Sequence, residues 1–177
     1  MMFSRITSAS VLALALVGVG ILVAPPATGQ DDTKNPVITK YGDVDMRSIL
    51  AELKLTYSES KDDEGLVVFD VKVGETEMNI YQYVDSRTKT IDSLSFSVGY
   101  DLPNGMDGRK INMFNGGNRF VKAYLDEEND PFIVNDIRVK EGVTRETLKE
   151  SISSFVAMIP KFESFIEADT AVAFKQR

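Results

Sequence analysis

The sequence predicts an α+β domain in which helices cover one face of an antiparallel sheet. Leu94, Phe96 and Val98 alternate with serines, so one side of this strand is apolar and the other carries small polar groups. Near the C-terminus, apolar residues recur with a period close to 3.6 between Leu148 and Ile166, as on one face of an amphipathic helix. The predicted order is α-β-β-β-α-β-β-α.

Residues 1–29 have the layout of a secretory signal peptide. Arg5 precedes an apolar run, Val11–Ala24, and two prolines and small residues lead to a predicted cleavage site before Gln30. The run is shorter than the roughly 20 residues of a membrane-spanning helix. We therefore expect a periplasmic or secreted protein without a stable membrane span after cleavage; the alternative is an anchor that is retained.

Three further boundaries divide the rest of the chain. Residues 30–44 are polar and are predicted to be a flexible lead-in, residues 45–168 form the α+β domain, and residues 169–177 form a C-terminal tail. Asp45 is expected to cap a first helix that runs from Met46 to about Leu55, because an aspartate oxygen accepts hydrogen bonds from the first free N–H groups of a helix.

Changes of periodicity and turn residues separate the remaining elements. A polar linker, 61–65, follows the first helix, and Asp107 is expected to cap the second helix. The predicted strands are 66–73, 76–84, 93–100, 120–125 and 132–139, and the second helix is 108–115. Thr144 should cap the last helix, and Pro160 should kink it or split it near Val156, since proline lacks the backbone donor.

The composition excludes several classes of function. The chain has no Cys and no His, so it offers no thiolate nucleophile, no imidazole base and no good zinc site. We predict no catalytic residues, no cofactor and no metal site; a hydrolase that uses only carboxylates is the remaining enzymatic alternative. The net charge of the chain, −7, makes nucleic acid a poor partner, because phosphates are bound by basic residues.

An acidic stretch has the spacing of calcium ligands but not the rest of their motif. Asp126, Glu128 and Asp130 alternate, whereas Pro131 and Ile137 stand where a calcium loop needs glycine and glutamate. The stretch is therefore predicted to be the solvated tip of a hairpin.

Several motifs resemble the YbjN-like family, described as bacterial sensory transduction regulators. They are the asparagines of the second helix and its end, the segment RFVKAYLD (119–126), and Gly142-Val143-Thr144 before the last helix. The resemblance covers about Asp45–Ile166. It implies the fold of type III secretion chaperones, small acidic proteins that often dimerise and hold an extended partner segment. Those chaperones work in the cytoplasm, so the signal peptide departs from the pattern.

The sequence suggests one partner-binding surface. Its candidate residues are Asn112, Asn115, Asn118, Arg119, Lys122 and Tyr124. Helix ends and turns also favour asparagine, and the strand residues also suit cross-strand pairing. Tyr81, Tyr83 and Tyr100 combine aromatic bulk with a hydroxyl, as interfaces often do.

We therefore expect an exported, non-enzymatic regulatory protein that binds an unknown protein or peptide as a homodimer. The alternative is a small-ligand sensor or stress-response factor with a pocket between the sheet and the C-terminal helix, where a kink at Pro160 would leave space.

Overall fold

The structure, a computed structural model, describes the main chain of residues 35–175 and the side chains as far as residue 168. The predicted signal peptide and residues 30–34 lie outside the described residues. The elements are β1 (Val37–Ile38), α1 (Asp43–Glu52), β2 (Tyr57–Lys61), β3 (Val67–Val73), β4 (Thr76–Val84), β5 (Ile91–Gly99), α2 (Gly108–Gly117), β6 (Lys122–Leu125), β7 (Pro131–Arg138), β8 (Val143–Thr144) and α3 (Arg145–Lys175).

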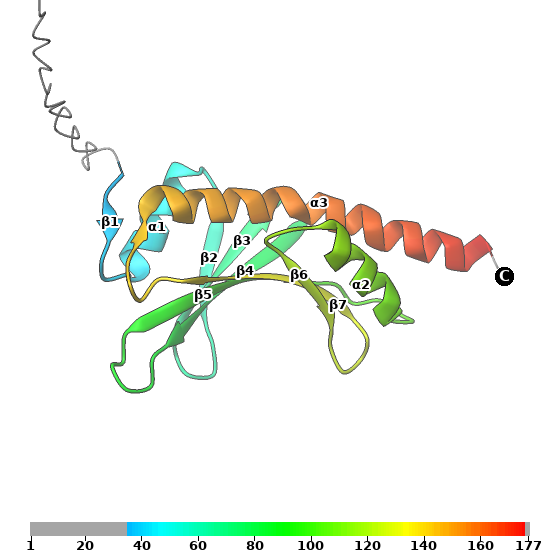
Figure 1. Cartoon of the computed structure of the whole chain (residues 1–177), viewed down its shortest axis with the longest axis horizontal. Coiled ribbons are helices and arrows are strands. Elements are labelled where there is room, and N and C mark those ends of the chain that lie inside the picture. The colour runs from blue at the N-terminus through cyan, green and yellow to red at the C-terminus, as the bar shows by residue number, and fades with distance from the viewer. Residues whose placement is uncertain (1–34, 176–177) are drawn as a thin grey trace, which may run out of the picture. The chain divides into compact units, whose positions relative to one another are not determined.

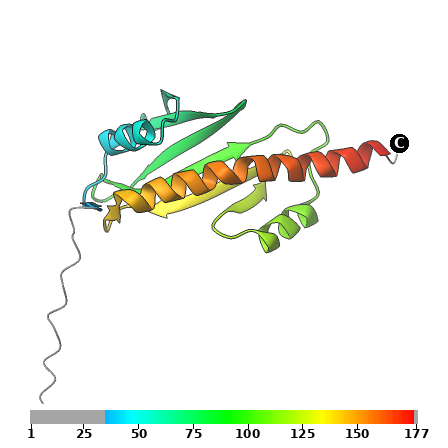
Figure 2. The ribbon, with the colours of Figure 1, turned by 90° about the horizontal axis from the view of Figure 1, so that it is seen from above.

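A six-stranded antiparallel sheet forms the centre of the domain. Its strand order is β2-β3-β4-β5-β7-β6, and β1 and β8 form a separate two-stranded sheet. The helices lie against one face of the large sheet, with α3 running across it (Figures 1 and 2). The predicted α+β class, with helices on one face of an antiparallel sheet, is confirmed; β1, β2 and β8 are additional to the predicted order.

The core lies between that face and the helices. The strands contribute their alternate apolar residues, among them Phe69, Ile80 and Phe96, which are fully buried. The Phe96 ring meets Phe155 of α3 with 5.9 Å between ring centres. Apolar burial of this kind is the dominant stabilising term in a domain without disulfides. The predicted alternation of apolar and small polar residues in β5 is therefore explained by the packing of its apolar side against α3.

No helix covers the opposite face of the sheet among the described residues. There β5 presents serines and Gly99, while larger side chains stand on the strands to either side. The Phe132 ring lies over Gly99: a Cβ added at this glycine would come within 2.2 Å of the ring. Tyr124 stacks on the same ring at 5.3 Å. We call this side of the sheet the open face.

The ordered domain begins before the predicted boundary at residue 45. Val37 and Ile38, within the predicted lead-in, pair with Thr144 and Val143, and Tyr41 is buried in the core. A flexible lead-in up to residue 44 is therefore wrong for this part. The sequence hides the strand because two residues are too short to show a period.

The first helix begins at Asp43 and not after Asp45. Gly42 is the N-cap, and the Asp45 carboxylate accepts a hydrogen bond from the Gly42 N–H at 2.9 Å. Asp45 thus serves the helix start from inside the first turn. The predicted caps of the other two helices are confirmed: Asp107 accepts from the Arg109 N–H and Thr144 from the Thr147 N–H.

The last helix passes through Pro160 without interruption, so the expected split does not occur. It continues to Lys175, so the main chain is helical through most of the predicted C-terminal tail, residues 169–177. Pro160 is exposed, whereas Ile159 and Phe162 beside it are buried. Among the described helices, none is both long and apolar enough for a membrane span.

Candidate functional site

An open cavity of about 620 Å³ lies where the first turns of α3 pass the sheet edge formed by β6 and β7. This is the general location predicted for a pocket between the sheet and the C-terminal helix, although Pro160 is not part of it. The lining residues come from three segments: Phe120, Val121 and Lys122; Val134, Asn135, Asp136 and Ile137; Thr147, Glu150, Ser151 and Ser154.

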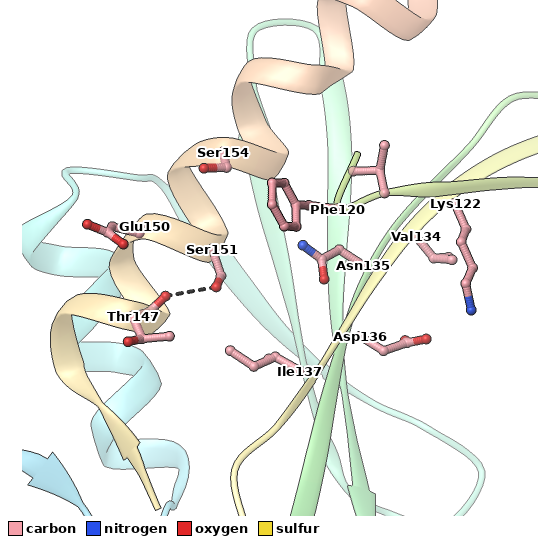
Figure 3. Close-up of a pocket in the computed structure, with 11 residues that line it drawn as sticks. Phe120, Lys122, Val134, Asn135, Asp136, Ile137, Thr147, Glu150, Ser151 and Ser154 are labelled. Atoms are coloured by element: carbon pink, nitrogen blue, oxygen red, sulfur yellow. Dashed lines mark hydrogen bonds between the residues drawn. The ribbon is translucent and has the colours of Figure 1, made fainter. Parts of the chain in front are cut away.

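Two faces of the sheet edge contribute to this cavity. Asn135 and Ile137 point toward α3, whereas Lys122 and Asp136 extend away from the helix (Figure 3). The alternation follows from the pleat, since neighbouring residues of a strand point to opposite faces. The cavity therefore opens at the side of the domain, with the helix above and the strand edge below.

Charged groups of the lining form no ion pair with any part of the chain that the structure describes. The ion pairs seen in the described residues include none made by Lys122, Asp136 or Glu150. By contrast, Arg145 and Lys149, on another side of the same helix, both pair with Glu52. Three charges without an ion pair therefore border the cavity, one from each of β6, β7 and α3.

Phe120 stands at this cavity in an unusual state. Its side chain is 78% exposed, and its backbone has φ of +65°. A left-handed conformation costs a non-glycine residue roughly 1–2 kcal/mol, and the large exposed ring gains little from burial. The guanidinium carbon of Arg119 lies 5.1 Å from the ring centre, a cation–π contact. An exposed aromatic ring held in a strained backbone indicates a functional site more than a stabilising one.

The three candidate asparagines have separate positions. Asn112 is exposed on α2, while the Asn115 side chain forms two hydrogen bonds with the main chain of Ala123 in β6. Asn118 donates from Nδ2 to the Phe114 carbonyl oxygen at 2.7 Å, which satisfies a group at the end of α2. The structure therefore gives Asn115 and Asn118 local structural contacts.

The other candidates lie nearer the cavity. Lys122 lines it directly, and Arg119 reaches it through the Phe120 ring. Tyr124 lies on the open face, stacked on Phe132, where burial first and neighbouring Tyr83 and Asp126 next raise the pKa of its hydroxyl. The six candidates thus do not form one continuous set, and their joint role in binding stays a prediction.

The acidic stretch after β6 forms a hairpin tip. The Asp126 carboxylate accepts hydrogen bonds from the N–H groups of Glu128 and Asp130, and Asp130 accepts from the Leu102 N–H at 2.8 Å. These carboxylates therefore organise the loop. No cluster of three or more acidic side chains suited to a metal ion occurs within residues 35–168.

Sequence reasoning placed a pocket beside the last helix but did not identify the residues of α3 that line it. Thr147, Ser151 and Ser154 follow one another at i, i+4 and i+7, beside the apolar stripe of the same helix. That spacing predicts one polar flank, but solvent-exposed helices have such flanks too. Only the three-dimensional structure brings this flank against β7.

The lining resembles a binding site more than a catalytic one. The Ser151 hydroxyl donates to the Thr147 carbonyl oxygen at 2.8 Å, so its proton is engaged by the helix and not by a base. A serine nucleophile needs an adjacent base that accepts this proton. The mixture of a ring, short hydroxyl side chains and isolated charges suits contacts with a bound polar chain.

Comparison with known protein families matches residues 44–168 to the YbjN family, described as "Putative bacterial sensory transduction regulator". Neither the curated proteins nor the solved structures gave a match. The matched segment covers more than half of the chain and includes all of α1 but its first residue, the whole large sheet and the part of α3 that lines the cavity. The chain therefore belongs to the YbjN family.

Proposed function

We propose that this chain is an exported regulator that binds a protein or peptide partner at the cavity beside α3 and catalyses no reaction. One observation carries the proposal: the cavity is open, and its charged side chains, Lys122, Asp136 and Glu150, have no partners within the described residues. Isolated charges around an exposed ring suit a partner that supplies the missing groups.

Site-specific photo-crosslinking tests this proposal. A photo-reactive amino acid at Ser154 faces the cavity, and the same group at Ser60 in β2 is a matched control on an exposed strand distant in the sheet order. We expect one discrete partner to be crosslinked from Ser154 and not from Ser60, and purified partner to compete. Identical crosslinks from both positions, or none from Ser154, would contradict partner binding here.

A small-ligand sensor is the second candidate. The cavity volume of about 620 Å³ is within the range of small-molecule pockets. A ligand that binds only the folded state raises the melting temperature, and the rise grows with the logarithm of the ratio of its concentration to its dissociation constant. A metabolite screen by thermal shift should therefore find a stabilising compound if this alternative holds, and no shift across the screen would favour the protein partner.

Export is part of the proposal. Residues 1–29 have the composition of a signal peptide, and we expect a mature protein that begins at Gln30 in the periplasmic or secreted fraction. Mass spectrometry of the intact protein from each cell fraction decides this. Full-length chain in the cytoplasmic fraction alone would contradict export.

A homodimer is also proposed. The open face supports it, because Tyr81, Tyr83, Tyr124 and Phe132 lie on one uncovered side of the sheet. Aromatic residues with a polar group are enriched at interfaces. Size-exclusion chromatography with light scattering should give twice the monomer mass, whereas a monomer at high micromolar concentration would contradict the dimer.

A further inference from the structure

We infer that the cavity receives an extended segment of a partner polypeptide, which adds as a strand to the free half of β7 and carries a basic side chain. This inference rests on the proposed function and specifies how the partner is held. It depends on where the main-chain groups of β7 point, on how the neighbouring strand ends, and on the charges beside that edge.

The main-chain groups of β7 alternate between its two neighbours. The Pro131 carbonyl oxygen accepts from the Tyr100 N–H at 3.1 Å, and the Val139 N–H donates to the main-chain carbonyl oxygen of Asp92 at 2.8 Å. Odd-numbered residues thus direct their N–H and C=O groups toward β5. In an antiparallel ladder, the even-numbered residues must direct theirs to the other edge.

The neighbour on that other edge is too short to satisfy all of them. β6 begins at Lys122, which pairs with Val134, so Asp136 and Arg138 lie beyond its start. The pairing register would place Phe120 opposite Asp136, but the left-handed backbone of Phe120 turns the chain out of the ladder. Within the described residues, the N–H and C=O groups of Asp136 and Arg138 on this edge have no hydrogen-bond partner.

On β6, the outer edge is closed at Ala123. Asn115 of α2 bonds both main-chain groups of Ala123, which point outward from β6. Proteins protect such edges because free N–H and C=O groups invite another strand. The outer edge is therefore protected at Ala123 of β6 and open at Asp136 of β7, and Asp136 borders the cavity. Strand addition is a general way to bind an extended peptide at such an edge.

The charges favour a basic segment. Two carboxylates border the free edge, Asp136 on the strand and Glu150 on α3, and neither forms an ion pair within the described residues. The cations beside them are Lys122 and Arg138, and the whole chain has a net charge of −7. A residue added opposite Ile137 would point toward α3, and residues opposite Asp136 and Arg138 would point to the open face. A lysine or arginine opposite Ile137 would meet Glu150, and one opposite Asp136 would meet the Asp136 carboxylate, whereas the place opposite Arg138 does not favour a basic residue.

Amide hydrogen exchange in the free protein tests the edge itself. The Asp136 and Arg138 amides should exchange at least about 100-fold faster than the amide of Ile137 between them, which points toward β5. Equal protection of all three amides would mean that the edge is already covered and would overturn the inference.

A defined probe then tests strand addition. The acetylated and amidated peptide TKVKVKT, at millimolar concentration, should slow exchange of the Asp136 and Arg138 amides by about tenfold or more. The matched peptide TEVEVET should slow it less than about twofold. No protection by either peptide, or equal protection by both, would overturn the basic strand.

Proline variants separate hydrogen bonding from folding. Asp136→Pro removes an N–H that points only to the free edge, so the domain should fold and lose TKVKVKT binding; Asp136→Asn, which keeps the N–H, should bind it with a smaller loss. Ile137→Pro removes a bond to β5 and should unfold the domain.

A charge-reversal variant covers the case in which Asp136→Pro does not fold. Glu150→Lys, on the surface of α3, should then shift the peptide preference of the protein toward TEVEVET. Strand addition is refuted if a folded Asp136→Pro binds TKVKVKT as well as the wild type does, or if Glu150→Lys does not change the peptide preference. The proposed function is tested separately, because it is refuted only if no partner is crosslinked from Ser154.

Discussion

Asn115 and Ala123 pair as two strand residues would, although Asn115 belongs to a helix. The Nδ2 group of Asn115 donates to the Ala123 carbonyl oxygen at 2.9 Å, and its Oδ1 accepts from the Ala123 N–H at 2.7 Å. One side-chain amide thus satisfies both main-chain groups of Ala123, which point away from β7.

Replacing this amide should leave two backbone groups unsatisfied. We expect Asn115→Ala to lower the free energy of unfolding by about 1–2 kcal/mol, the usual cost of such a loss. Asn112→Ala, on an exposed position of the same helix, should change it by less than about 0.5 kcal/mol. Urea denaturation of both variants measures the difference, and equal stability of the two would show that the pairing contributes nothing.

The Asp85–Lys140 pair predicts a loss of stability in acid. The hydrogen bond from Lys140, then those from the Thr88 and Arg87 N–H groups, lower the pKa of Asp85 well below its ordinary value of 3.8. A lowered pKa in the folded state stabilises the fold above the ordinary pKa, and the contribution is lost as pH falls below about 4 toward the folded value.

Asp85→Asn should therefore be less stable than the wild type at pH 7, and the difference should shrink steadily below pH 4. Chemical denaturation of both proteins from pH 7 to pH 2 measures it. Because Glu52 and Glu59 are present in both proteins, their own lowered pKa values cancel in the difference. A gap that stays constant with pH would contradict the assignment.

The backbone of Phe120 predicts an unusual order of variants. At φ of +65°, glycine is unstrained and alanine is not, so Phe120→Gly should be more stable than Phe120→Ala by about 1 kcal/mol. At Met113, which is exposed in α2, the order should reverse by a similar amount because glycine disfavours helix. Thermal or chemical denaturation of the four variants tests this; the helical order at both positions would refute the strain.

Pro160 predicts a stabilising substitution. Since α3 is continuous through this exposed position, alanine can supply the N–H that proline lacks and relieve its steric conflict with the preceding turn. Pro160→Ala should raise the free energy of unfolding by about 1–3 kcal/mol. The neighbouring exposed Lys161→Ala is the control and should have little effect. A loss of stability in Pro160→Ala would mean that packing of Ile159 and Phe162 needs the proline geometry.

Local patterns predicted the parts of the fold that are locally determined. The strands at Val67–Val73 and Thr76–Val84 match their alternation closely, because one face of each packs under helices. The Asp107 and Thr144 caps were readable because a side-chain oxygen needs only the next two or three residues to accept a hydrogen bond.

The rest depends on contacts between distant segments. β2 has the polar sequence YSESK, and of its residues only Tyr57 packs against the core, as in its edge-to-face contact with Phe69. No alternation marks such an edge strand. The cavity was located only in general terms, since the approach of the Thr147–Ser154 flank to β7 and the left-handed Phe120 have no local signal in the sequence.

The contact of Phe132 with Gly99 has an evolutionary consequence. Any side chain at position 99 would collide with the ring, so these two sites on neighbouring strands should change together among homologous proteins. A larger residue at 99 should occur with a smaller one at 132, and a lineage that replaces the glycine alone would need a compensating mutation to keep its sheet intact.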